Sequence, residues 1–141
     1  MNNLFSFLIE HWILSGFFVL TLILLIVYEW YQQKQGVKGL SAQELTNWVN
    51  HDNARLIDIR DSALFKKGHI AGSILVDASL LSQVAAAWQD KTQAIIVICS
   101  SGVTAIKTAS QLQGLGFSKV AVLTGGIRSW QSEGLPLIQG K

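Results

Sequence analysis

The sequence has few of the residues on which several common kinds of site depend. It contains a single cysteine, Cys99, so no disulfide can form within the chain and a zinc site built from several cysteines is excluded. The three histidines are far apart in the sequence, and we expect no metal and no cofactor. The longest basic run is Lys66-Lys67, and no segment has the Gly-x4-Gly-Lys-Ser/Thr pattern, so we predict no nucleic-acid partner and no nucleotide-phosphate loop.

Charged residues are also scarce, at 14% of the 141 residues, and the shortage is concentrated near the N-terminus. The chain carries no charge from Trp12 to Tyr28. A helix that continued from there to Trp30 would be about 28 Å long, close to the ~30 Å hydrocarbon core of a membrane. Aromatic residues lie at both edges, as they do at membrane interfaces. We therefore predict one transmembrane helix over about residues 12–30.

A cleaved signal peptide and a buried core helix are the alternatives for this segment. No Lys or Arg precedes it and no small-x-small cleavage pattern follows it, which disfavours a signal peptide. Lys34 and Lys38 follow the span, whereas Glu10 is the only charged side chain before it. This bias predicts a single-pass protein of the inner (cytoplasmic) membrane, with its C-terminal domain in the cytoplasm. A lone thiol agrees with that reducing compartment.

The rest of the chain alternates between strand and helix patterns. Strands are predicted at residues 55–59, 73–77, 94–98 and 119–123, and helices at 41–50, 79–88, 103–113 and 127–133. The strand at 94–98 is apolar throughout, as expected of a central parallel strand covered on both faces. The fold class predicted is α/β, with a mainly parallel sheet flanked by helices. We divide the chain into an N-terminal segment with the anchor (1–31), a linker (32–39) and one domain (40–141).

Cys99 directly follows the predicted central strand, at the sheet edge where sites of α/β proteins form. The next residues predict a tight loop that opens into a helix, whose free N–H groups and dipole stabilise an anion. We therefore expect Cys99 to act as a thiolate nucleophile near neutral pH. The alternative is a buried, inert cysteine. Such a cysteine would not need Gly102 and the start of a helix directly after it.

Four segments, in order, resemble the rhodanese-type sulfurtransferases. They are the Cys-x-x-Gly-Val-Thr-Ala loop at 99–105, Leu-Ile-Asp-Ile-Arg at 56–60, Gly-His-Ile-Ala-Gly-Ser at 68–73, and Gly-Gly-Ile-Arg-Ser-Trp at 125–130 followed by Gly-Leu-Pro at 134–136. The resemblance covers about residues 40–138 and implies a rhodanese-like domain. The whole layout is similar to single-span, membrane-tethered rhodanese-like proteins of Gram-negative bacteria.

The resemblance implies a two-step transfer of sulfane sulfur. Cys99 would take sulfur from a donor such as thiosulfate or a persulfide, and would pass it from a Cys99 persulfide to a thiol or another nucleophilic acceptor. The implied persulfide-binding loop consists of Ser100, Ser101, Gly102, Val103, Thr104 and Ala105. Its N–H groups would bind the persulfide, and Gly102 would permit the turn. The loop hydroxyls could donate to the substrate or form local bonds instead.

The loop departs from the family pattern because it carries no charge. Members active on thiosulfate usually have Arg or Lys at or near the position of Ser100, and a hydroxyl there forfeits about 1.5–3 kcal/mol of charge-assisted binding. We therefore expect weak thiosulfate activity. In sequence, the nearest cation is Lys107. Related phosphatases carry the phosphate-binding Arg where this chain has Ala105, so we do not expect phosphatase activity.

Four further residues could support the site. Asp58 and Arg60 flank a strand end, where they could pair with each other or cap a loop, and we expect a structural role rather than a catalytic one. His69 could sense pH, but we expect a turn histidine to hydrogen-bond to the backbone. Arg128 could approach the site from the neighbouring strand end. The alternative function is a catalytically weak or inactive module that recruits a partner protein to the cytoplasmic face of the membrane.

Overall fold

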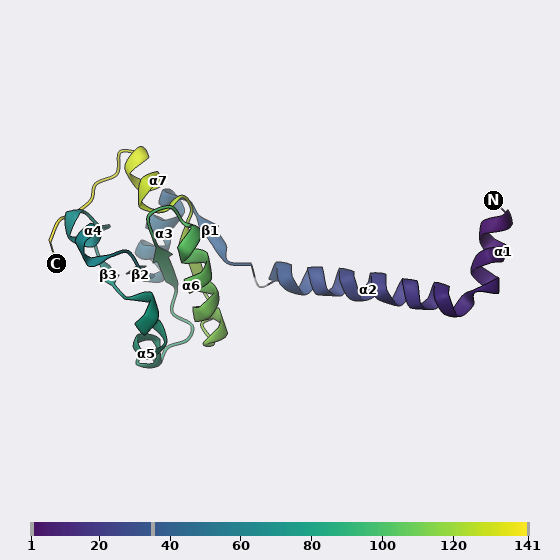
Figure 1. The fold of residues 1–141 in the computed structure, drawn as a ribbon. Helices are drawn as coiled ribbons and strands as arrows, with labels where there is room; N and C mark the ends of the chain where they lie inside the picture. Colours follow the sequence, from purple (N-terminus) through teal and green to yellow (C-terminus); the bar gives the residue numbers. More distant parts are fainter. Residues whose placement is uncertain (1, 35, 141) are drawn as a thin grey trace. The chain divides into compact units, whose positions relative to one another are not determined.

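The computed structural model of the chain describes residues 2–34 and 36–140, and the side chains of residues 2 and 32–34 lie outside this description. The chain divides into two compact units, Met1–Gly36 and Val37–Lys141, which we describe separately (Figure 1).

The first unit consists of two helices, α1 (Asn2–Glu10) and α2 (Trp12–Lys34). The stretch Trp12–Tyr31 of α2 has a mean hydropathy of 2.2 over its most apolar window, and none of that window is buried. In length and composition this helix fits a membrane span, and a signal sequence near the N-terminus would have the same properties. The short helix α1 was not predicted from the sequence.

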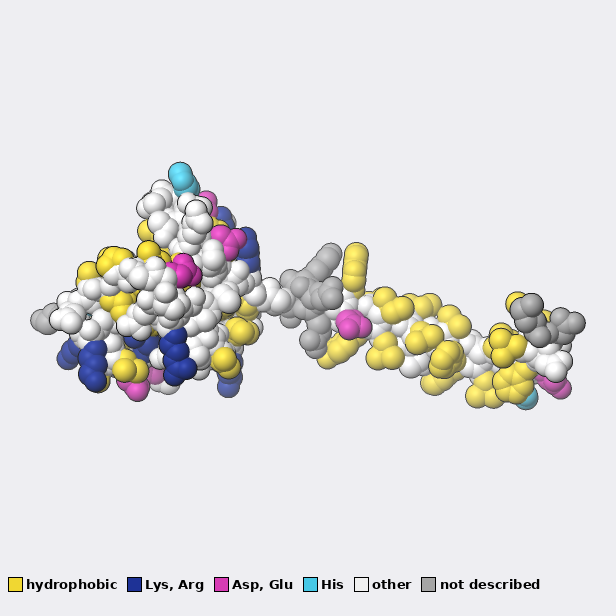
Figure 2. All heavy atoms as spheres, turned by 90° about the horizontal axis from the view of Figure 1, so that it is seen from above, with side chains coloured by type: hydrophobic (Ala, Val, Ile, Leu, Met, Phe, Trp, Pro, Cys, Tyr) yellow, Lys and Arg dark blue, Asp and Glu magenta, His cyan; other side chains and the backbone are white. Residues whose placement is uncertain are grey.

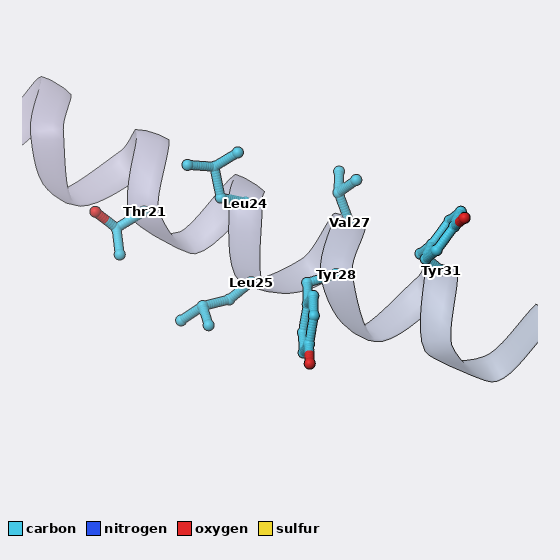
Figure 3. A pocket seen from close by; sticks show the side chains of 6 residues that line it. All are labelled: Thr21, Leu24, Leu25, Val27, Tyr28 and Tyr31. Atoms are coloured by element: carbon cyan, nitrogen blue, oxygen red, sulfur yellow. The ribbon is translucent and has the colours of Figure 1, made fainter.

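Apolar side chains (yellow) cover most of the visible surface of α2 (Figure 2). Figure 3 shows six side chains that line a hollow on this helix alone: Thr21, Leu24, Leu25, Val27, Tyr28 and Tyr31. The hydroxyl of Thr21 donates to the carbonyl oxygen of Phe17 at 2.8 Å. This polar group of α2 is therefore satisfied within the helix, as a lipid environment would require.

The second unit is built on a five-stranded sheet. Its strands are β1 (Lys38–Leu40), β2 (Arg55–Asp58), β3 (Ser73–Leu75), β4 (Ile95–Ile98) and β5 (Val120–Leu123). They lie in the order β1-β5-β4-β2-β3, and every pairing is parallel. Strand β4 is therefore central, as its unbroken apolar sequence predicted.

Helices cover both faces of this sheet (Figure 1). They are α3 (Ala42–Asp52), α4 (Ser62–Lys67), the 3-10 turn η1 (Ala78–Leu80), α5 (Leu81–Ala86), α6 (Val103–Gly114) and α7 (Gly126–Ser132). Alternate strand residues point to opposite faces. One face packs against α3 and α7 around Leu56, Ile96 and Leu123, and the other packs against α5 and α6 around Val97 and Val122.

The segment predicted as a linker, residues 32–39, overlaps both a helix and the sheet. Helix α2 continues to Lys34, and β1 starts at Lys38, which pairs with Ala121. Gln35, within the predicted linker, lies outside the described residues. Strand β1 was missed in the sequence because its three residues, Lys-Gly-Leu, include a charged residue and a glycine, both of which are depleted in strands.

Candidate active site

Cys99 lies immediately after the central strand β4, at the carboxyl edge of the sheet. It is 4% exposed and belongs to the core cluster on the α5–α6 side of the sheet. It follows Ile95 and Val97 on the same face, because side chains alternate along the strand. The strand thus fixes the direction in which the sulfur points.

The backbone of the following loop turns back onto the sulfur. The N–H of Gly102 donates to Sγ of Cys99, with a nitrogen–sulfur distance of 2.9 Å. Gly102 has φ of +90°, a left-handed conformation that favours glycine, and it directly precedes the first residue of α6. The expected turn and helix start are therefore present, and one loop N–H already contacts the sulfur.

Helix α7 holds the loop from its other side. The N–H of Ile127 donates to the carbonyl oxygen of Cys99 at 2.9 Å, and that of Arg128 donates to the carbonyl oxygen of Ser100 at 3.2 Å. Gly126 has φ of +60°, and a Cβ there would collide with the carbonyl oxygen of Cys99. The Gly-Gly motif at 125–126 therefore allows the start of α7 to pack directly against the cysteine loop.

These two hydrogen bonds also orient the loop N–H groups. All the described peptide bonds are trans, so the N–H of each peptide points away from its carbonyl. The N–H groups of Ser100 and Ser101 consequently point away from α7, and no acceptor contacts them within residues 36–140. The same holds for the N–H groups of Val103 and Thr104 in the first turn of α6. Several donors beside the sulfur are thus available to an anion.

The loop hydroxyls form no local bonds in the described part of the chain. No hydrogen bond involves the side-chain oxygen of Ser100, Ser101 or Thr104, although the sequence left a local capping role open. Ser101 and Thr104 are exposed, and Ser100 is half-buried. These hydroxyls are therefore able to donate to a bound molecule.

Asp58 and Arg60 form an ion pair, which is one of the two arrangements that the sequence left open. Nε of Arg60 lies 3.0 Å from both carboxylate oxygens of Asp58, and Nη2 lies 2.7 Å from Oδ2. The same Nη2 donates to the carbonyl oxygen of Gly68 at 2.8 Å. The pair is almost completely buried and ties the end of β2 to the turn after α4.

His69 is also a structural residue in this unit. Its Nδ1 lies 2.8 Å from the carbonyl oxygen of Phe65, and its ring stacks on the Phe65 ring with centroids 3.7 Å apart. The backbone of His69 pairs with Ile138 in both directions. The expected hydrogen bond between the His69 ring and the backbone is therefore present, although His69 lies in an isolated bridge with Ile138 and not in a turn.

A pocket of about 420 Å³ lies beside the loop, and it changes the electrostatic view drawn from the sequence. Ser100 and Arg128 line it together with Arg60 and Lys67. In sequence, Lys107 is the cation nearest to the loop, and Arg60 and Arg128 were expected as possible supporting residues. Both arginines line the pocket, and the fold adds Lys67 of α4, which the sequence did not indicate.

Among the described residues, no group of three or more His, Cys, Asp or Glu side chains could hold a metal ion. The arrangement brings together one thiol, a set of backbone donors and a nearby cationic pocket. A thiolate or persulfide is the species that such donors stabilise.

Known proteins are similar to this unit in both sequence and fold. A family model described as Rhodanese-like domain matches residues 41–133. The chain therefore belongs to the rhodanese-like domain family. Full-length similarity extends to the uncharacterized protein YibN of Escherichia coli (strain K12), at 33% identity over 100% of both chains.

Two further similarities concern the domain. The thiosulfate sulfurtransferase GlpE of Pseudomonas aeruginosa (strain PAO1) is 33% identical over 91 residues, which cover 64% of this chain and 82% of GlpE. A rhodanese-related protein of known structure from Thermoplasma volcanium is 25% identical, with a TM-score of 0.65 over 73% of this chain and 99% of the other. Both the sequence family and the fold expected from the four motifs are thereby confirmed.

Proposed function

We propose that this protein is a membrane-anchored sulfurtransferase that carries sulfane sulfur as a persulfide on Cys99. The observation that carries the proposal is the 2.9 Å contact from the N–H of Gly102 to the sulfur, in a loop whose other N–H groups lack acceptors among the described residues. The similarity to GlpE, which is named a thiosulfate sulfurtransferase, supports this class of activity. A loop of this kind stabilises sulfur in its anionic forms.

The proposed reaction has two steps and no net oxidation. The Cys99 thiolate attacks the outer sulfur of the donor, forming a sulfur–sulfur bond while the donor's own sulfur–sulfur bond breaks. The donor leaves as sulfite or as a thiolate, and Cys99 becomes a persulfide anion. An acceptor thiolate then attacks the terminal sulfur, and Cys99 leaves as a thiolate again. The anion on the enzyme at each stage is held by the same N–H groups.

The proposed anchor is helix α2. Its exposed apolar surface and its length support a retained span. Lys34 and Lys38 follow the span, and Glu10 precedes it. The side chain of Lys34 lies outside the described residues. This asymmetry supports an inner-membrane protein whose rhodanese-like domain is cytoplasmic.

Partner recruitment is the second candidate function, and one observation favours it. Val103 is 72% exposed and Ile106 is 50% exposed, and both lie in the first turns of α6, next to the cysteine loop. Apolar side chains at such positions are suited to contact with another protein. In the sulfurtransferase proposal that protein is the sulfur acceptor, and in the alternative it is recruited without sulfur transfer.

A transfer assay on the detergent-solubilised full chain separates these functions. We expect sulfur to move from a persulfide donor to cyanide or a thiol with ping-pong kinetics, and the Cys99→Ser variant to be inactive. Thiosulfate should be a poor donor, because the loop lacks a charged side chain. Absence of turnover with every donor, from a folded protein, would leave recruitment as the function.

A further inference from the structure

The amino edge of the sheet carries a group of basic side chains. All the strands are parallel, so they all begin at this edge. Lys38 is the first residue of β1, Arg55 is the first of β2, and Lys119 directly precedes β5. Lys91 lies in the loop before β4, and its carbonyl oxygen accepts from the N–H of Ser118 at 3.0 Å. We call Lys38, Arg55, Lys91 and Lys119 the basic edge.

Aromatic rings hold two of these cations in place without neutralising them. Cζ of Arg55 lies 4.5 Å from the centroid of the Trp88 ring, and Nζ of Lys91 lies 4.1 Å from that of Phe117. The two rings contact each other edge to face, with their centroids 6.0 Å apart. Attraction to a ring leaves the charge of a cation intact. Both cations therefore stay available to an anion at the surface.

The positive charge of this edge is only partly compensated. Lys119 pairs with Asp52 at 2.9 Å, and Asp90 accepts two hydrogen bonds within its own loop. The other three members of the basic edge form no ion pair with any described residue. Glu44 interacts with Lys38 over a longer range, but it lies in the first turn of α3, at the opposite edge of the sheet. Four cations therefore stand against two carboxylates at the amino edge.

The chain enters the domain at this same edge. The apolar stretch of α2 ends at Tyr31, and β1 begins seven residues later at Lys38. A chain spans at most about 3.6 Å per residue, so these residues reach about 25 Å when fully extended. If α2 spans the membrane, as proposed above, the start of β1 stays within that distance of the lipid headgroups.

A surface of anionic lipids fits this edge better than a soluble anion does. Anionic phospholipids make the headgroup layer negative, and this layer attracts basic residues that lie near an anchor. The short tether keeps the lipid surface at a high effective concentration, which no dissolved anion shares. Trp88 is half-buried, and Leu115, between α6 and β5, is 42% exposed. Aromatic and apolar side chains of this kind suit the boundary between headgroups and hydrocarbon.

We propose that the basic edge binds the phosphate groups of anionic phospholipids and docks the domain on the membrane beside its anchor. This inference rests on the proposed anchor and goes beyond it by assigning a lipid-binding surface to the domain. Cys99 lies at the opposite edge, after the four residues of β4, which span about 13 Å. Docking therefore turns the cysteine loop toward the aqueous phase, where soluble donors and acceptors reach it.

The test measures how fast each lysine of the full chain is acetylated in lipid nanodiscs. One set of discs contains phosphatidylcholine alone, and the other also contains phosphatidylglycerol. Acetic anhydride is the reagent, because it is neutral and lipid charge does not repel it. We expect Lys91 to react about fivefold more slowly in the anionic discs, the factor for one basic side chain near an anionic surface. Lys66 and Lys107, which lie outside the basic edge, should react equally in both.

Two conditions show whether lipid charge causes the protection. High salt should remove the difference between the discs, because it screens exposed charges. Free glycerophosphate added to the neutral discs should not protect Lys91. Protection by the free anion equal to that by the anionic lipid would overturn the assignment of the edge to a membrane surface.

Variants assign the protection to the basic edge. Arg55→Gln should bring the two Lys91 rates closer together, and Lys38→Gln, at an exposed position, gives the same test if Arg55→Gln does not fold. Arg128→Gln is the matched control, because it makes the same change beside Ser100 at the carboxyl edge. Its two Lys91 rates should differ as in the unmodified chain. Equal Lys91 rates in both discs, or an equal effect of Arg128→Gln, would overturn the proposal.

A second measurement keeps this proposal separate from the proposed anchor. If the protein made in a Gram-negative bacterium lacks α2, the anchor fails. Flotation of that mature chain with vesicles of the same two compositions then tests the edge alone. Flotation that requires phosphatidylglycerol and is lost in Arg55→Gln would still support lipid binding by the edge, and its absence would overturn it.

Discussion

Single residues determine how closely α7 approaches Cys99. Gly126 has a positive φ and no room for a side chain, because the backbone of Cys99 and Ser100 lies against it. Gly102, in the cysteine loop, packs against the Gly-Gly turn at 125–126. A Cβ added to Gly102 would lie 3.0 Å from the backbone N of Gly125. The cysteine loop and the Gly-Gly turn are therefore packed as one unit, and we expect a change in either one to displace Cys99.

Gly126→Ala should destabilise the protein and impair the site together. We expect a loss of about 1–2 kcal/mol from the positive φ and about 1–3 kcal/mol more from overpacking. Gly134→Ala is the control, since its φ of +72° is similar but its Cβ would meet open space. Urea unfolding of the detergent-solubilised chain measures both variants. Equal losses would contradict the close packing described here.

The buried pair of Asp58 and Arg60 should stabilise the domain far more than an exposed pair does. Asp58→Ala leaves a nearly buried guanidinium without its partner, which costs about 3–5 kcal/mol. The Asp52–Lys119 pair is the comparison, because its side chains are about 40% exposed and Asp52→Ala should cost less than about 1 kcal/mol. Unfolding midpoints report the difference. Similar shifts for the two variants would show that Asp58 is not a structural anchor.

The sequence pointed to Cys99 and its loop as the candidate site, but it did not indicate the whole of the pocket beside them. Cys99 and Gly102 could be found because both lie in one short segment with a recognisable spacing. Arg128 was named as a residue that could approach the site, and it lines the pocket with Ser100. Lys67 was not named: it is separated from Cys99 by 32 positions, and its place beside Ser100 depends on how α4 packs onto the sheet, which no local pattern encodes.

At the level of elements, local signals located most of the helices and strands. The capping box of α3 is present, with the N–H of Glu44 donating to Oγ of Ser41 at 3.2 Å and the N–H of Ser41 donating to Glu44 Oε2 at 2.9 Å. Helices α1 and α4 were missed. Helix α4 has only six residues, and a single turn and a half is too short to show a hydrophobic period.

The capping box predicts a specific dependence on pH. The backbone N–H of Ser41, then its side chain, lowers the pKa of Glu44 from its ordinary value of 4.5. A lowered pKa in the folded state gives stability that is present above the unfolded pKa and is lost as the pH falls through the folded pKa. Glu44→Gln keeps an acceptor but cannot ionise.

The stability difference between the native chain and Glu44→Gln should therefore shrink as the pH is lowered from about 6 to about 3. Denaturant unfolding at each pH measures the free energy of unfolding of both proteins. Taking the difference between the two removes the contributions of other carboxylates, such as Asp77. A difference that stays constant over this range would show that the carboxylate charge does not stabilise α3.

Helix α2 should be retained as a membrane span. Expressed in a Gram-negative bacterium, the protein should stay with membranes after alkaline carbonate extraction and have the intact mass of the full chain. Replacing Leu24 and Leu25 with Arg should abolish insertion, at about 2.5–3.5 kcal/mol for each residue, whereas replacing both with Ala should not. A mature protein that lacks the helix would identify a signal sequence instead.

For the whole molecule, the parallel sheet explains why the site could be located before the structure was known. When strands alternate with helices, the carboxyl ends of all the parallel strands lie at the same edge of the sheet. The residue after the most apolar strand then lies at the centre of that edge. The observed order puts β4 between β5 and β2, so Cys99 meets α7 on one side and the end of β2 on the other. The order of the strands could not be predicted, because the sequence of β1 has no recognisable strand pattern.

The most direct test of the account is the intact mass of the detergent-solubilised full chain after incubation with thiosulfate or an organic persulfide. We predict the gain of one sulfur atom, which dithiothreitol removes and which the Cys99→Ser variant does not show. A folded chain whose Cys99 reacts with iodoacetamide but gains sulfur from no donor would contradict the claim that this loop carries a persulfide.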